Sequence, residues 1–191
     1  MGCDIHMHLE YRKPYISDNW VNGDYLVINP YWKANGEQLF IDSDFETFVN
    51  YIPIYDGRCY QLFTLLAGVR NYFSEIDVHS PKGLPEDVTS ITKLFSDIWG
   101  DDGHSHSYFT LSQLIGIAKD IYIKGGYTKE SLNNYMGDNR LIALYSLLTI
   151  IHRIKKRCAE LHVIQDSWWH KDKEKAYNAA KDVRIVFWFD N

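Results

Sequence analysis

The first ten residues, Met1-Gly2-Cys3-Asp4-Ile5-His6-Met7-His8-Leu9-Glu10, alternate between apolar and polar side chains. Because successive side chains of a strand point to opposite faces, this alternation predicts a strand over residues 2–11 with two chemically different faces. The apolar face can pack on a core and is formed by Cys3, Ile5, Met7 and Leu9. The other face either meets water or builds a site, and it is formed by Asp4, His6, His8 and Glu10.

A second strand is predicted at the other end of the sequence, over Val183–Asp190, which is rich in β-branched and aromatic residues. A short strand is expected at Tyr25–Ile28, within a loop-rich region over residues 14–35, and residues 38–49 carry no decisive pattern. Residues 100–107 are so polar that they indicate a loop. Apolar periodicity predicts helices over residues 56–73 with Asp56 as N-cap, 85–99, 111–123 with a Thr110–Gln113 capping box, 138–162 and 168–180.

The order strand, loops, helices, strand predicts an α+β fold. We expect one compact domain over residues 1–191, in which a small sheet contains both terminal strands and is covered by about four helices. A chain of 191 residues is long enough to bury a substantial core as one domain.

Composition excludes several classes of partner. The formal net charge of -5 disfavours a broad nucleic-acid footprint, which needs a basic surface. The longest apolar run, Leu141–Ile151, is too short to cross a bilayer, so no membrane association is expected. Three cysteines (Cys3, Cys59 and Cys158) form neither a disulfide framework nor a zinc spacing. Together these features favour a cytoplasmic protein with reduced thiols.

The polar face of the first strand raises a metal hypothesis. Two imidazoles with a neighbouring carboxylate can hold one divalent transition metal, which can then activate water. In this hypothesis the ligands are Asp4, His6, His8 and, from a distant loop, His104. The alternative interpretation is a half-exposed strand with polar residues in solvent, as antiparallel sheets commonly have.

Basic and small residues near predicted helix ends and tight turns raise an anion-binding hypothesis. Free backbone N–H groups at helix starts attract phosphate, and arginine adds a bidentate fork. The residues concerned are Arg58, Arg70-Asn71, Lys82-Gly83 and Gly103-His104-Ser105. The alternative is that Arg58 and Lys82 are solvated and that Arg70 binds carbonyl groups near the end of its helix.

The opening Met1-Gly2-Cys3-Asp4-Ile5-His6 resembles the start of the MGCDIH-type proteins, which are found mainly in bacteriophages and prophages. Similarity continues in further islands in the order of that family: Tyr55-Asp56-Gly57-Arg58, Leu66–Asn71, Gly83-Leu84-Pro85, Gly103-His104-Ser105 with Thr110-Leu111, and Val183–Asn191. The chain departs from the family's usual residues at Cys59, Gly68 and Lys82, and His106 lies at a variable position. The resemblance implies a phage context, and hence the cytoplasm of an infected bacterium, but supplies no established activity.

Together, the phage context and the anion hypothesis favour a protein that binds and sequesters a phosphorylated, nucleotide-like small molecule, such as a host immune signal, as an anti-defence protein. The expected ligand-binding residues are His6, Arg58, Tyr60, Arg70, Asn71, Lys82, Gly83, His104, Ser105, Ser107 and Trp188, with Tyr60 or Trp188 beside the base. We expect a homo-oligomer that needs no cofactor. The alternative is a metal-dependent hydrolase or phosphodiesterase that uses the Asp-x-His-x-His motif, so the sequence leaves open whether the ligand is held or cleaved.

Overall fold

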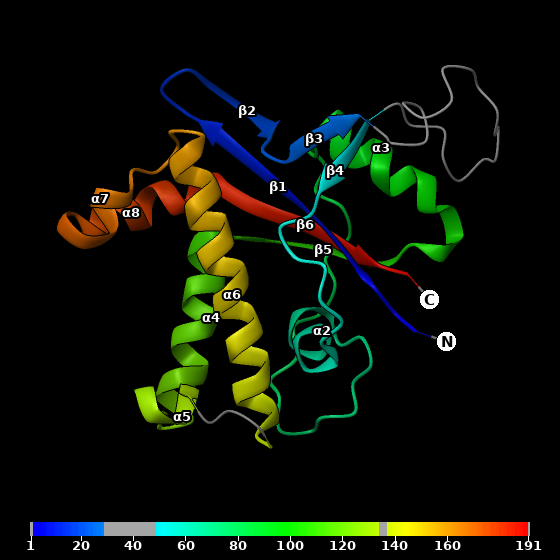
Figure 1. The fold of residues 1–191 in the computed structure, drawn as a ribbon. Coiled ribbons are helices and arrows are strands. Elements are labelled where there is room, and N and C mark those ends of the chain that lie inside the picture. The colour runs from blue at the N-terminus through cyan, green and yellow to red at the C-terminus, as the bar shows by residue number, and fades with distance from the viewer. Residues whose placement is uncertain (1, 29–48, 134–136, 191) are drawn as a thin grey trace.

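The centre of the fold is a four-stranded antiparallel sheet in the order β2-β1-β6-β5 (Figure 1). The computed structural model describes residues 2–28, 49–133 and 137–190. The strands are β1 (Ile5–Lys13), β2 (Ser17–Asn22), β5 (His104–Thr110) and β6 (Val183–Phe189). The predicted α+β class is confirmed, and the first and last strands are neighbours as expected.

β6 is one of the two inner strands of the sheet, and its sequence allows it to be buried on both faces. Its seven residues are all buried, and they include three β-branched and three aromatic side chains that suit a pleated surface. It pairs with β1 from Ile5 opposite Phe189 to Tyr11 opposite Val183. This register brings residues more than 170 positions apart in the sequence into contact.

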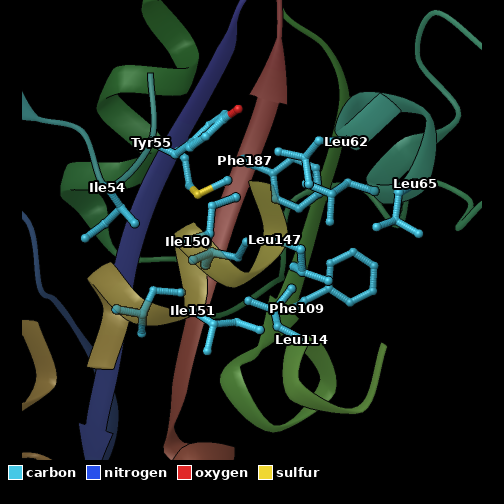
Figure 2. Close-up of a cluster of buried hydrophobic side chains, with 14 of the residues drawn as sticks. Ile54, Tyr55, Leu62, Leu65, Phe109, Leu114, Leu147, Ile150, Ile151 and Phe187 are labelled. Atoms are coloured by element: carbon cyan, nitrogen blue, oxygen red, sulfur yellow. The ribbon is translucent and has the colours of Figure 1, made fainter. Parts of the chain in front are cut away.

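One face of the sheet carries the main hydrophobic core. It is covered by α2 (Tyr60–Ala67), α4 (Leu111–Lys124) and α6 (Asn139–Glu160). The apolar face of β1 packs here as predicted, since Cys3, Met7 and Leu9 are fully buried in this core. Figure 2 shows Phe187 of β6 among side chains from several elements, including Leu147 and Ile150 of α6.

The opposite face of the sheet is covered as well, which the sequence did not indicate. The helix α3 (Ser90–Trp99) and the two-stranded sheet of β3 (Tyr25–Ile28) and β4 (Val49–Ile52) lie on this side (Figure 1). On this face Trp188 is fully buried and Phe95 is nearly so. His6, His8 and Glu10 therefore lie largely inside the protein. The alternative interpretation, a half-exposed strand with its polar residues in solvent, is wrong for these three side chains.

The remaining elements are short. They are α5 (Lys129–Asn133), α7 (Asp166–Lys171), α8 (Lys173–Ala179) and the 3-10 turns η2 (Gly100–Asp102) and η3 (Ala180–Asp182). Within the described ranges, every helix is too short or too polar to cross a membrane.

Three strands were not predicted: β4, and the two edge strands β2 and β5, whose sequences are polar. Residues 100–107 are not a loop, since β5 begins at His104 and pairs with β6. As an edge strand, β5 tolerates an irregular register between His104 and Ser107, and Ser105 adopts a positive φ of 53° there. β2 is also a largely exposed edge strand, so it needs no apolar alternation. Tyr25–Ile28 is confirmed as a strand, and residues 38–48 lie outside the described part of the chain.

The helix boundaries also differ in part from the predictions. The predicted start at Asp56 is wrong, because the chain is extended at Cys59 and the helix begins at Tyr60. It ends at Gly68, whose φ of 66° is a left-handed conformation that glycine adopts without strain. The helix predicted from residue 85 begins only at Ser90, since Thr89 is its N-cap.

The predictions for the later helices agree better with the structure. The Thr110–Gln113 capping box of α4 is confirmed in both of its hydrogen bonds. The longest helix, α6, begins after Asp138, whose side chain accepts hydrogen bonds from the first turn. The helix predicted over residues 168–180 is divided at Asp172, where a φ of -138° interrupts α7 and α8.

Candidate functional site

Three histidines surround the buried Trp188 on the second face of the sheet; we call His6, His8, His106 and Trp188 the histidine cluster. The ring centroids of the three histidines lie 5.7, 5.1 and 5.6 Å from that of Trp188, respectively. His6 also packs 4.2 Å from Trp99 at the end of α3. The sequence predicted Trp188 beside a bound base. In the structure its ring packs against other rings of the protein and its side chain is fully buried, so it cannot take that role.

His8 is held by a buried carboxylate. Its Nδ1 lies 2.7 Å from Oδ2 of Asp24, and the other oxygen of Asp24 accepts the backbone N–H of Leu9 at 2.8 Å. The ring of Tyr51 packs 4.0 Å from His8. The pair joins β1 to the start of β3 and has no access to solvent, since both side chains are fully buried.

Glu10 belongs to a second buried network. One of its oxygens accepts the N–H and the hydroxyl of Thr89 at 2.9 and 2.8 Å, and the other accepts from Arg184 at 2.7–2.8 Å. Arg184 also binds Asp87 at 2.7 Å and stacks 3.9 Å from the ring of Trp20. These contacts fix the start of α3 on the sheet, so Glu10 has a structural role.

The alternative metal site of Asp4, His6, His8 and His104 is not formed. Asp4 binds Arg58, His8 is sealed against Asp24, and His104 stacks on Phe189, which lies on the opposite face of the sheet from His8. In the described ranges, no three His, Cys, Asp or Glu side chains are placed to hold one ion. The predicted alternation of polar and apolar side chains along β1 is correct. The elements that pack on the polar face, however, give each of its side chains a different partner.

Charged residues do converge where β1 begins and β6 ends; we call Asp4, His6, Arg58, Arg70 and Asp190 the amino-terminal corner. Arg58 Nε and Nη2 donate to the two oxygens of Asp4 at 2.7 and 2.6 Å. Arg70 donates to the carbonyl oxygen of Gly2 at 3.5 Å and lies 6.0 Å from the ring of Tyr60. The adjacent Asn71 is exposed. Two guanidinium groups thus meet at one end of the sheet.

Two carboxylates balance these cations. The N–H of Asp4 donates to Asp190 Oδ1 at 2.8 Å, and His6 Nε2 lies 3.3 Å from Asp190 Oδ2. Burial lowers the pKa of His6, although the hydrogen bond with Asp190 opposes this shift. The hydrogen bond from Arg58 lowers the pKa of Asp4. Near neutral pH the corner therefore holds two positive and two negative charges.

Lys82 and Gly83, which were also predicted to bind the ligand, lie away from this corner. Lys82 donates to the carbonyl oxygen of Tyr108 at 2.6 Å and lies 3.9 Å from the ring of Phe109. Tyr108 pairs with Val186, which lies three residues before Phe189 on β6. At about 3.3 Å per residue, Val186 is about 10 Å from the end of β6 where the corner lies. Lys82 and the neighbouring Gly83 thus follow the outer edge of β5, because the N–H of Gly83 donates to the carbonyl of His106 at 2.8 Å.

The serines of β5 do not face an open site. Ser107 is fully buried, and its hydroxyl has no hydrogen-bond partner among the described residues. Ser105 lies 3.0 Å from His104 Nδ1, and both are half-buried on the edge strand. Among the described residues, Ser105 and His104 contact each other, and His104 also stacks on Phe189.

An open pocket of about 420 Å³ adjoins the histidine cluster. It is lined by Gly83, Leu84, Ser96, Asp97, Gly100 and His106. Ser96 Oγ lies 2.9 Å from His106 Nε2, and burial lowers the pKa of His106. Sequence reasoning missed this pair, because Ser96 lies on a helix and is joined to β5 only by the fold. The lining includes one carboxylate and no cation, so its charge does not favour an anion.

Comparisons of this chain with family models, with curated proteins and with solved structures found no match.

Proposed function

We propose that the protein binds a phosphorylated, nucleotide-like small molecule at the amino-terminal corner. The observation that carries this proposal is the fork of Arg58, which holds both oxygens of Asp4 while the two side chains remain 51% and 48% exposed. A phosphate offers a guanidinium the same pair of oxygens as a carboxylate. Asp4 thus keeps Arg58 in a geometry that also suits a phosphate, at a place that solvent reaches.

Displacement of Asp4 is energetically feasible. An exposed ion pair contributes about 0–1 kcal/mol, so a phosphate has little to overcome when it replaces the carboxylate. Once Asp4 has moved away, Arg58 and Arg70 leave the corner with net positive charge. Tyr60 beside Arg70 supplies an aromatic ring, and the exposed Asn71 supplies hydrogen-bond donors. Together these groups match a phosphate attached to a planar base.

Sequestration is the use of this site that the residues favour. His6, the one histidine of the corner, is held by Asp190, and its lowered pKa keeps it neutral near pH 7. The hydrolase alternative requires Asp4, His6, His8 and His104 on one ion, and those side chains have separate partners. The resemblance to phage proteins supports an anti-defence role, in which the ligand is a signal of the infected bacterium. We propose that the working form is a homo-oligomer, which sedimentation velocity would test.

Calorimetric titration tests the binding proposal. The probes are cyclic dinucleotides, ADP-ribose derivatives and, as the minimal phosphate ligand, pyrophosphate. Arg58→Gln is expected to weaken binding at least tenfold, because it removes a charge-assisted, bidentate contact. Asp4→Asn is expected to strengthen binding by up to about fivefold, since about 1 kcal/mol of competition disappears.

Lys93→Gln is the matched control, because it removes the same charge from an exposed ion pair on α3. Its affinity for the probes should equal that of the wild type. The proposal is wrong if folded protein binds none of the probes. It is also wrong if Asp4→Asn weakens binding as much as Arg58→Gln, because Asp4 would then support the site rather than compete with the ligand.

A further inference from the structure

A second pocket, of about 210 Å³, lies where α4 ends and α6 begins. The floor of the pocket is apolar. It is formed by Leu65 of α2, by Ile76 from the segment between α2 and α3, and by Ala143 of α6, all of which are buried in the main core. Ile121 of α4 adds a partly buried apolar wall. No residue of the amino-terminal corner lines this pocket, so it is a separate feature of the molecule.

The rim of the pocket is charged and has a net charge of +1. Lys124 and Arg140 contribute the cations, and Asp77 contributes one carboxylate. Arg140 Nε donates to the carbonyl oxygen of Glu75, which holds its guanidinium at the rim. Lys124 Nζ lies 3.3 Å from Asp77 Oδ2, and both side chains are more than 60% exposed. This ion pair is weak because water screens it.

We propose that this pocket binds a small monocarboxylate with a short apolar tail. The tail covers the apolar floor, and the carboxylate meets Arg140 and Lys124 at the rim. At about 30 Å³ per water-sized group, the volume holds about seven such groups, which is the size of a five- or six-carbon acid. A ligand of so few atoms is expected to bind with a Kd on the order of 1 mM.

The chemistry of the lining distinguishes this acid from other small ligands. An alcohol of the same length covers the floor but adds no negative charge to a lining with a net charge of +1. An alkylammonium ion places a like charge beside them. Inorganic phosphate satisfies the rim but leaves the apolar floor in contact with water. Only the acid uses both parts of the pocket.

Titrations followed by amide chemical shifts test this proposal, with hexanoate, hexanol and hexylammonium as the three probes. Hexanoate is expected to shift amides around Ala143 and Gly125 and to bind at least tenfold more tightly than the other two. Arg140→Gln is expected to weaken hexanoate binding about tenfold. Asp77→Asn is expected to strengthen it a few-fold, because this change removes the only negative charge of the lining.

Lys119→Gln is the matched control, since Lys119 lies on α4 but does not line the pocket. Both Lys119→Gln and Arg58→Gln should bind hexanoate as the wild type does, so this test is independent of the phosphate site. The inference is overturned if hexanoate leaves these amides unshifted. It is also overturned if hexanol binds as tightly as hexanoate, or if Lys119→Gln weakens binding as much as Arg140→Gln.

Discussion

Replacement of Glu10 by glutamine is expected to destabilise the protein strongly, although it changes no volume. Glu10 is fully buried, and Arg184 is only 5% exposed, so the substitution leaves a buried guanidinium without its buried counter-charge. Glutamine can still accept hydrogen bonds from Thr89, and it cannot neutralise Arg184. The expected loss of stability therefore measures the effect of the missing charge and not of altered packing.

The magnitude follows from the contacts of Arg184. Removal of one partner from a buried ion pair costs about 3–5 kcal/mol. The remaining partner, Asp87, binds Arg184 at 2.7 Å but is 63% exposed, so it compensates only in part. We expect Glu10→Gln to lower the free energy of unfolding by about 3 kcal/mol. For a chain of this length, at about 2–4 °C per kcal/mol, the thermal midpoint falls by about 9 °C.

Urea unfolding followed by circular dichroism and by tryptophan fluorescence measures this loss. Asp87→Asn is the matched control: it removes a charge from the same arginine at the exposed side and should cost about 1 kcal/mol or less. Glu10→Met combined with Arg184→Met removes both buried charges and should be less damaging than Glu10→Gln alone. The reasoning fails if Glu10→Gln unfolds within 1 kcal/mol of the wild type, or if Asp87→Asn costs as much.

Three further predictions concern stability. Burial lowers the pKa of His6, His79 and His106, so the folded state binds fewer protons than the unfolded state near pH 6. Stability should therefore fall as the pH drops below about 6.5, with a slope of up to about 1.4 kcal/mol per pH unit for each histidine. Urea midpoints that stay constant from about pH 8 to about pH 5.5 would contradict this expectation. Thr110→Ala should cost about 1 kcal/mol, because it removes the cap of α4, and Thr110→Ser should restore most of that loss in the same assay. Leu147→Ala should cost about 2–5 kcal/mol, since Leu147 is fully buried in the main core, and a loss below 1 kcal/mol would mean that this core is not tightly packed.

The sequence predicted the elements whose pattern is local. Val183–Phe189 could be recognised because β-branched and aromatic residues dominate it, and α4 because Thr110 and Gln113 form a capping box within four residues. β5 could not be recognised, since its polar residues follow the rules of an edge strand that become visible only when β6 is beside it. Local signals therefore defined the centre of the fold better than its edges.

The candidate site was predicted only in part, because its composition depends on long-range pairing. Arg58, Arg70 and His6 do meet at one end of the sheet. Nothing in their local sequence, however, indicated that Asp4 and Asp190 would balance their charge. Trp188 was expected at a ligand and is instead enclosed, because α3 covers the second face of the sheet.

The adjacency of β1 and β6 bears on how the molecule forms during synthesis. β6 supplies the middle of the sheet, yet it is translated after all the helices that cover that sheet. Until it emerges from the ribosome, α2, α4 and α6 have no complete apolar surface to pack on, and such late, long-range pairing is slow. The apolar faces of these helices therefore stay exposed for most of translation, which makes the nascent chain a substrate for chaperones.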